Sequence, residues 1–219
     1  MFKIKELNDV LAFANKAHAG QKRKYTDEDY IIHPMRVAFA GIYAGGCTAK
    51  RTAVAAALLH DVVEDTSVTF EELRLFLSRV FINDDDTAQI MRLVIALTDV
   101  YTKDNFIDLN RNQRKEKERW RMGTTFDSTL YQIKIADMLD NQHSINKYDP
   151  SFAKTFNAEY LLFLEHAENH FGEKGLEFHI AELMYAYHCV DSMASIYDHK
   201  FCGLIEPIIS VDLLGTNDE

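Results

Sequence analysis

The sequence is poor in cysteine and has none of the spacings that a disulfide framework or a structural zinc site needs. Its 3 cysteines, Cys47, Cys189 and Cys202, lie far apart and are odd in number. A disulfide-stabilised secreted domain would carry an even set at closer spacing, and a zinc knuckle would show a CxxC pair. We therefore expect a protein of a reducing compartment whose fold depends on its apolar core.

Long apolar runs and an excess of basic residues are also missing. No segment approaches the roughly 20 consecutive apolar residues that span a bilayer, and the N-terminal MFKIKELNDV lacks the apolar core of a signal peptide. The 24 Lys and Arg are outnumbered by 34 Asp and Glu. A duplex nucleic-acid binder needs a basic face, so we expect neither that function nor a membrane protein. A cytoplasmic protein with a local basic pocket for a small anionic ligand is compatible with this balance.

Helix breakers are scarce, with 3 Pro and 9 Gly in 219 residues, and no segment alternates like a strand between turn signals. Apolar residues recur instead at helical spacing, first from Leu7 to Ala19 with Gly20 as the stop. Thr69 and Glu72 form a capping-box pattern that predicts another helix start. The remaining helices are predicted from Pro34 to about Gly45, from a Thr48 cap through His60-Asp61, from the acidic run 84–86, and over 111–122, 128–145, 151–171 and 174–190.

The length suits one sizeable hydrophobic core. We find no internal repeat, low-complexity segment or linker composition in the chain. The sequence therefore predicts a single all-α domain over residues 1–200, followed by a C-terminal tail over 201–219. It gives no indication of the oligomeric state.

Residues 60–66, HDVVEDT, carry the strongest chemical signal. The adjacent His60 and Asp61 can offer a nitrogen and an oxygen to one point, and Glu64 and Asp65 follow at positions that share a helical face. Four ionisable groups behind the apolar run AVAAALL are costly to bury unless a metal or a hydrogen-bond network compensates them. The run indicates a hydrolytic metal site, although a His-Asp pair alone is as often just a helix end.

Two further residues lie in apolar surroundings, His33 in YIIHP and Asp137 in QIKIADMLDN. Alone, His33 would more often be a capping or core histidine, and Asp137 could pair with Lys134 on its own helix. Buried aspartates are rare without a partner. Together with His60 and Asp61 they make a mixed nitrogen and oxygen set that suits Mn²⁺, Fe²⁺, Co²⁺ or Mg²⁺ better than a closed zinc site.

The blocks GQKRK, YIIHPMRVA, AALLHDVVEDTSVTFEEL, ALTD and IKIADMLDNQHSI resemble the hydrolase domain of RelA/SpoT-type proteins over roughly residues 8–170. The similarity is greatest to the small stand-alone alarmone hydrolases of the HD-domain metal-dependent phosphohydrolase superfamily. This resemblance implies an all-α, HD-type helical bundle with one divalent ion, commonly Mn²⁺, held between helices.

Residue by residue, the resemblance implies three groups of functional side chains. The metal ligands are His33, His60, Asp61 and Asp137. The catalytic acids acting on the attacking water are Glu64 and Asp65. The substrate contacts are Arg23, Lys24, Arg111, Asn141 and Tyr160. Asp140 stands where relatives often carry His or Tyr, and we expect this departure to affect the pocket rim more than the metal.

The implied activity is that of an enzyme of the stringent response, which removes the 3′-diphosphate from the alarmones guanosine tetraphosphate and pentaphosphate. GDP or GTP and pyrophosphate would be released by direct attack of water activated at the metal, since no GxSxG or His-paired Cys supplies a nucleophile. Two alternatives stay open: a phosphatase of the same fold acting on NADPH or another phosphorylated nucleotide, and a non-catalytic nucleotide-binding regulator. The intact Glu64-Asp65 pair argues against the regulator. The basic residues of the segment RKEKERWR, 114–121, are expected to be mostly solvated.

Overall fold

The computed structural model describes residues 4–44, 50–125 and 127–171, and the predicted all-α architecture is confirmed within these ranges. An isolated bridge between Lys22 and Asp29 is the one β-type contact described there. No helix among these residues is long and apolar enough to cross a membrane. The helices are α1 (Ile4–Ala17), α2 (Ile32–Ala44), α3 (Arg51–Leu59), α4 (Val62–Asp65), α5 (Phe70–Val80), α6 (Asp84–Leu97), α7 (Arg111–Gly123), α8 (Ser128–Tyr148) and α9 (Pro150–Phe171).

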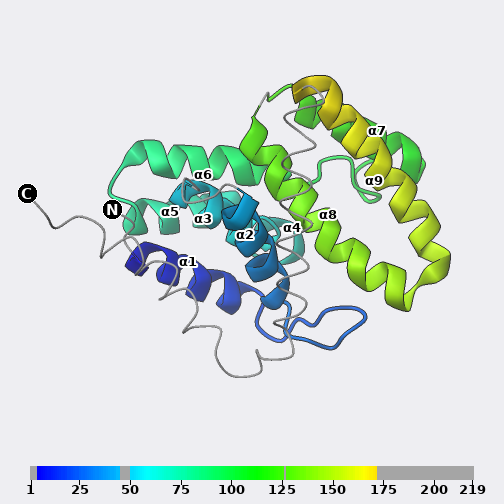
Figure 1. Cartoon of the computed structure of the whole chain (residues 1–219). Helices are drawn as coiled ribbons and strands as arrows, with labels where there is room; N and C mark the ends of the chain where they lie inside the picture. The colour runs from blue at the N-terminus through cyan, green and yellow to red at the C-terminus, as the bar shows by residue number, and fades with distance from the viewer. Residues whose placement is uncertain (1–3, 45–49, 126, 172–219) are drawn as a thin grey trace, which may run out of the picture.

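Helix α3 lies at the centre of the bundle and packs against α1, α2, α6 and α8 (Figure 1). Its alanines Ala55, Ala56 and Ala57 are at most 1% exposed, and such small side chains let neighbouring helices approach closely. Helix α8 crosses between this group and the pair α7 and α9, packing on α2 and α9. Helices from distant parts of the sequence therefore meet beside the C-terminal end of α3.

Local capping signals account for several helix starts. The Thr69 side chain accepts from the Glu72 N–H and the Glu72 carboxylate accepts from the Thr69 N–H, so the predicted capping box is confirmed. A second capping box, between Asn110 and Gln113, begins α7. Helix α6 begins at Asp84 as predicted, with Asn83 as its cap.

Other predicted boundaries shift or fall outside the described residues. Helix α2 begins at Ile32, so Pro34 is inside its first turn. The predicted start at Pro34 is therefore wrong, because the helix begins before that residue. Helix α3 begins after Lys50, which makes no side-chain cap. Thr48, the predicted helix over 174–190 and the tail over 201–219 lie outside the described part of the chain.

The helix that was predicted to continue through His60-Asp61 ends at Leu59. His60 and Asp61 form a turn, and the short helix α4 then carries Glu64 and Asp65. The chain changes direction here because Asp61 adopts φ −98° and ψ −5°, outside regular helix geometry. As a result, the side chains of the HDVVEDT run are distributed over two helix ends.

The loop before α2 folds back toward α8. Its Arg23 N–H donates to the Glu28 carbonyl at 2.8 Å and its Tyr30 N–H donates to the Gln21 carbonyl at 3.0 Å. Asp27 takes a φ of 58°, a left-handed conformation that Asp tolerates better than most residues. This turn holds Arg23 beside α8, where its guanidinium donates to Asp140.

Candidate metal centre

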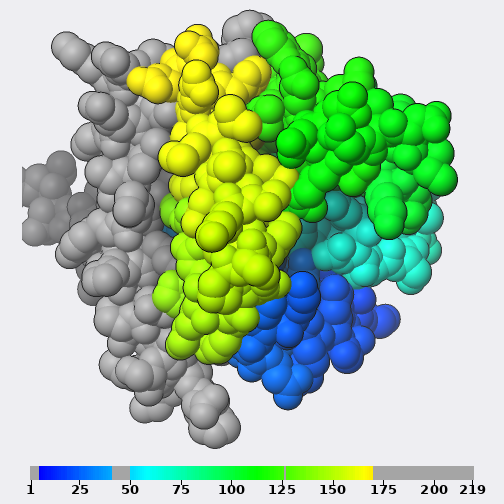
Figure 2. Space-filling view, turned by 90° about the vertical axis from the view of Figure 1, so that its right-hand side faces the viewer, coloured from blue at the N-terminus to red at the C-terminus, as the bar shows by residue number. Residues whose placement is uncertain are grey.

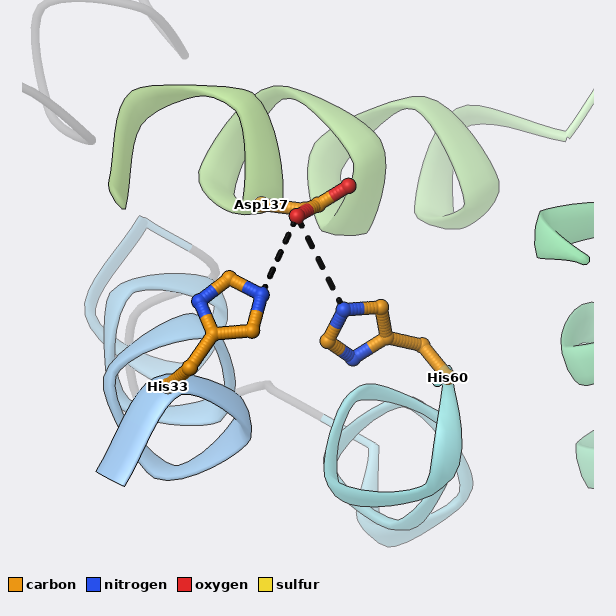
Figure 3. Close-up of side chains that lie close together, drawn as sticks. All are labelled: His33, His60 and Asp137. Atoms are coloured by element: carbon orange, nitrogen blue, oxygen red, sulfur yellow. Dashed lines mark ion pairs between the residues drawn. The ribbon is translucent and has the colours of Figure 1, made fainter. Parts of the chain in front are cut away.

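Three helices bring two imidazoles and a carboxylate together (Figure 3). His33 comes from α2, His60 follows the end of α3, and Asp137 projects from α8. Nε2 of His33 lies 3.2 Å from Oδ1 of Asp137, and Nε2 of His60 lies 3.8 Å from the same oxygen. All three side chains are buried. Among the described residues they form a group whose ligand atoms could hold one metal ion.

Asp61 contributes a fourth donor to this group. Its Oδ2 lies 3.0 Å from Nε2 of His60 and 3.4 Å from Nε2 of His33. Two ligand atoms that each bind a common ion at about 2.1 Å lie about 3.0–3.4 Å apart when the angle between them is octahedral or tetrahedral. Three of these four separations fall in this range, and that between Nε2 of His60 and Oδ1 of Asp137, at 3.8 Å, is wider. The structure therefore brings the four predicted ligands close together.

The tautomers of both histidines are set by their outer nitrogens. Nδ1 of His33 donates to Oδ2 of Asp140 at 2.7 Å, and Nδ1 of His60 donates to the Ala57 carbonyl at 2.7 Å. When each ring is neutral, its proton is on Nδ1 and its Nε2 presents a lone pair to the centre of the group. Both Nε2 atoms are buried without a hydrogen-bond partner in the described part of the chain. Such orphaned nitrogens fit a metal ligand.

Protons compete with a cation for this site. Burial by itself would lower the pKa of His60, but the carboxylates of Asp61 and Asp137 reverse this and raise it to about 9. Burial likewise opposes ionisation of Asp61, yet the neighbouring imidazoles hold its pKa well below the usual range. The metal-free centre is therefore an array of imidazolium and carboxylate groups, from which a divalent cation would displace protons.

Asp137 is held by two neighbours on its own helix. Lys134 Nζ lies 2.8 Å from Oδ2, and Asn141 Nδ2 donates to Oδ1 at 2.7 Å. The alternative interpretation of Asp137, an ion pair with Lys134, is therefore present beside the metal-ligand geometry. Both can coexist because a carboxylate has two oxygens and about four acceptor positions.

The two expected catalytic acids lie at the edge of the centre. Oε2 of Glu64 accepts the Asp99 N–H at 2.9 Å, and desolvation together with the Asp99 carboxylate raises the pKa of Glu64 to about 7. The Tyr30 hydroxyl lies 2.7 Å from Oδ2 of both Asp61 and Asp65. Tyr30, which the sequence reasoning missed, thus links an expected catalytic acid to an expected metal ligand.

A pocket of about 240 Å³ opens beside the centre. In the space-filling view a hollow lies between α9, the green segment that includes α7, and the blue loop before α2 (Figure 2). The charged and polar lining is Tyr30, Asp61, Glu64, Asp65, Asp99, Arg111, Lys115, Glu118, Arg119, Lys134, Asp137, Asn141 and Glu159. The apolar lining is Met122, Met138, Phe156 and Phe163.

One face of α7 supplies most of the positive charge in this pocket. Arg111, Lys115 and Arg119 are spaced four residues apart and so lie along one stripe of the helix. Arg111 pairs with Glu159 at 2.6 Å and Lys115 with Asp99 at 2.6 Å, whereas Arg119 has no ion pair among the described residues. The expectation that this helix is mostly a solvated face therefore misses a stripe that faces the pocket.

The expected substrate contacts are placed differently from one another. Arg111 and Asn141 line the pocket. Arg23 does not line it but donates to Asp140 and Asn141, and the exposed Lys24 lies 3.1 Å from the Tyr25 hydroxyl. Tyr160 is buried and is not part of the lining. The roles of these five residues stay predictions.

Asp140 contradicts its expected place at the pocket rim. It is 2% exposed and accepts a hydrogen bond from the imidazole of His33. The physical reason is the helical period, because positions three and four residues after Asp137 share its face and so point to the same centre. This spacing was available in the sequence as a signal.

Comparison with known proteins identifies the family of this chain. An HD domain family model matches residues 10–162. The chain is 31% identical to the guanosine-3′,5′-bis(diphosphate) 3′-pyrophosphohydrolase MESH1 of Mus musculus over 147 residues, which are 67% of this chain and 73% of that protein. It is 32% identical to the Homo sapiens MESH1 over 146 residues, 66% of this chain and 72% of that protein.

Longer relatives match through part of their length. A probable guanosine-3′,5′-bis(diphosphate) 3′-pyrophosphohydrolase of Synechocystis is 28% identical over 187 residues, which cover 85% of this chain but 23% of that protein. A solved structure of a metazoan ortholog of SpoT that hydrolyzes ppGpp superposes with a TM-score of 0.63 at 22% identity, covering 84% of this chain and 97% of that one. The last match supports the fold. The chain therefore belongs to the HD domain family and, within it, to the group that contains the MESH1 proteins.

Proposed function

We propose that this chain is a metal-dependent hydrolase that removes the 3′-diphosphate from guanosine tetraphosphate or pentaphosphate, giving GDP or GTP and pyrophosphate. The observation that carries the proposal is the convergence of two orphaned imidazole nitrogens and two carboxylates beside a pocket with a cationic wall. The activities named for the MESH1 relatives support the same substrate class. We further propose Mn²⁺ as the ion and the cytoplasm, in alarmone turnover, as the setting.

The proposed ligands of the ion are His33, His60, Asp61 and Asp137. A divalent cation bound there would polarise a phosphoryl oxygen and lower the pKa of water. Lys134 and Asn141 fix the Asp137 carboxylate from outside, so its direction toward the imidazoles is set before any ligand arrives. Such preorganisation avoids reorientation during the reaction.

Glu64 is the proposed general base. The Asp99 N–H orients its carboxylate, and a pKa of about 7 matches the requirement that a base at neutral pH should both accept and release a proton. Asp65 is proposed as a second acid, held through the Tyr30 hydroxyl that also contacts Asp61. Both acids face the pocket, where the attacking water and the scissile phosphate would meet.

The stripe on α7 is proposed to bind phosphates. The rise of an α-helix separates Arg111 from Arg119 by about 12 Å, enough to contact phosphate groups at two different points of one nucleotide. Positive groups there would also stabilise the charge that spreads over phosphoryl oxygens in the transition state. Phe156, Phe163 and Met138 offer an apolar part of the pocket to the sugar and base.

The test is incubation of the purified chain with Mn²⁺ and guanosine tetraphosphate, with the products separated by ion-exchange chromatography. The proposal expects equimolar pyrophosphate and GDP, no orthophosphate, and no reaction in excess EDTA. Release of orthophosphate, or consumption of NADPH alone, would establish the alternative phosphatase. Nucleotide binding without turnover under several divalent metals would establish the non-catalytic regulator.

A further inference from the structure

Asp140 is a buried carboxylate that belongs to the surroundings of the metal centre. Its Oδ2 accepts from Nδ1 of His33 at 2.7 Å and from Nη2 of Arg23 at 3.0 Å, while Nη1 of Arg36 lies 3.8 Å from its Oδ1. Both Asp140 and His33 are at most 2% exposed. Burying a carboxylate is costly unless it is paired, and here two guanidinium groups compensate it.

Arg23 joins this carboxylate to the support of a second ligand. Its Nη2 also donates to Oδ1 of Asn141 at 3.0 Å, and Nδ2 of Asn141 donates to Oδ1 of Asp137 at 2.7 Å. One guanidinium nitrogen therefore contacts the residues that hold His33 and Asp137. Arg23 thereby ties the loop before α2 to α8, while the hydrogen bond between His33 and Asp140 ties α2 itself to α8.

The two imidazoles are supported in different ways. Nδ1 of His60 donates to a neutral backbone carbonyl, that of Ala57, in the helix that His60 follows. Nδ1 of His33 donates to a charged side chain, 107 positions away in the sequence. A carboxylate that accepts from the outer nitrogen fixes the ring and makes the inner nitrogen a stronger electron-pair donor to a metal ion. The affinity of His33 for a metal ion therefore depends on the Asp140 side chain, which a substitution can remove.

We infer that Asp140 and Arg23 are positioning residues of the metal centre, an inference that rests on the proposed function. Asp140 holds the His33 ring with Nε2 toward the ion, and Arg23 holds Asp140 and Asn141 together. Arg23 therefore belongs to the outer shell of the centre in this chain, a role separate from the substrate contact that the family resemblance implies. Loss of either residue weakens metal binding before any substrate is present.

The experiment is calorimetric titration of Mn²⁺ alone into the metal-free full chain. Asp140→Ala is expected to weaken binding by about 10- to 100-fold, the range typical of outer-shell carboxylates. Asp140→Asn keeps an acceptor without its charge and should lose less. Arg23→Ala should also weaken binding, whereas Lys22→Ala, which removes an exposed cation paired with Asp29 in the same loop, should leave affinity within twofold.

A second readout follows the His33 ring itself. In the Zn²⁺-loaded, ¹⁵N-labelled wild type, the Nδ1 proton of His33 should exchange slowly with solvent, and in Asp140→Ala it should exchange fast while the helical circular dichroism is retained. Unchanged Mn²⁺ affinity in both Asp140 variants would overturn the inference. If Asp140→Ala does not fold, unchanged affinity in Asp140→Asn alone overturns it. A wild-type chain that binds no divalent ion would instead refute the metal centre of the proposed function.

Discussion

The backbone N–H of Asp99 donates a 2.9 Å hydrogen bond to Oε2 of Glu64, although the two residues are 35 positions apart in the sequence. The loop after α6 thereby orients an acid that α4 carries. The side chain of Asp99 faces the same region and pairs with Lys115 of the cationic stripe. The proposed base and the proposed phosphate-binding helix thus share one loop as their common support.

Glu64→Gln is expected to lower kcat by about 10²- to 10⁴-fold, the usual contribution of a positioned acid–base group. The amide keeps the size of the side chain and can still accept the Asp99 N–H, so the fold should be retained. Because Glu64 is outside the ligand group, Mn²⁺ affinity should stay within twofold. Steady-state kinetics with calorimetry checks both halves. A variant that keeps full turnover would exclude Glu64 as the base.

The raised pKa of Glu64 also predicts a pH-dependent stability of the metal-free chain. With a pKa of about 7 when folded and 4.5 ordinarily, the folded state holds a proton between these values that the unfolded state has released. The free energy of unfolding must therefore fall as pH rises through this window. Glu64→Gln removes that titration, so its gain in thermal midpoint over wild type should be negligible below pH 4.5 and largest above pH 7.

The matched control for this prediction is Glu71→Gln. Glu71 is an exposed glutamate whose pKa is lowered by hydrogen bonds from Arg74. Its replacement should show no gain that grows with pH. Thermal unfolding of the three proteins in EDTA from pH 4 to 8 gives the comparison. A constant offset between Glu64→Gln and wild type across that range would contradict the prediction.

Much of the fold could be predicted because its signals are local. The apolar period of α1 and the Thr69–Glu72 capping box depend on residues within one or two helical turns. The break at His60-Asp61 could not be predicted in this way. It coincides with tertiary contacts such as that between the Tyr30 hydroxyl and Asp61, which join residues 31 positions apart in the sequence.

The same division holds for the candidate site. His33, His60, Asp61 and Asp137 stand in sequence motifs, so the sequence alone predicts them as a ligand set. Their supports are defined by distance in space: Lys115 meets Asp99, and Arg23 meets Asp140, through tertiary packing that no spacing encodes. For Asp140, the helical spacing in the sequence predicts that it shares a face with Asp137. The sequence does not predict its hydrogen-bond partner, His33.

The affinity of the centre for Mn²⁺ is expected to rise with pH between 6 and 8. The pKa of His60 is raised to about 9 in the metal-free chain, and that of His33 is raised as well. A bound ion requires neutral imidazoles, so binding must release protons, and affinity can rise up to about tenfold per pH unit for each proton displaced. Calorimetry in two buffers of different ionisation enthalpy counts these protons. A flat profile without proton release would mean that the imidazoles are already neutral.

Arg119→Gln is expected to raise the KM for guanosine tetraphosphate about 10- to 100-fold, because a hydrogen bond to a charged group contributes about 1.5–3 kcal/mol. Arg119 lines the pocket, and within the described ranges no carboxylate neutralises it, so its charge is available to a phosphate.

The control is Lys117→Gln, which removes the same charge from the same helix. Lys117 lies over the Tyr101 ring and outside the pocket lining. If net charge alone mattered, both variants would raise KM equally at low salt. A selective effect of Arg119 that persists at higher salt identifies a direct phosphate contact, because long-range attraction is screened under those conditions and a contact ion pair is screened much less.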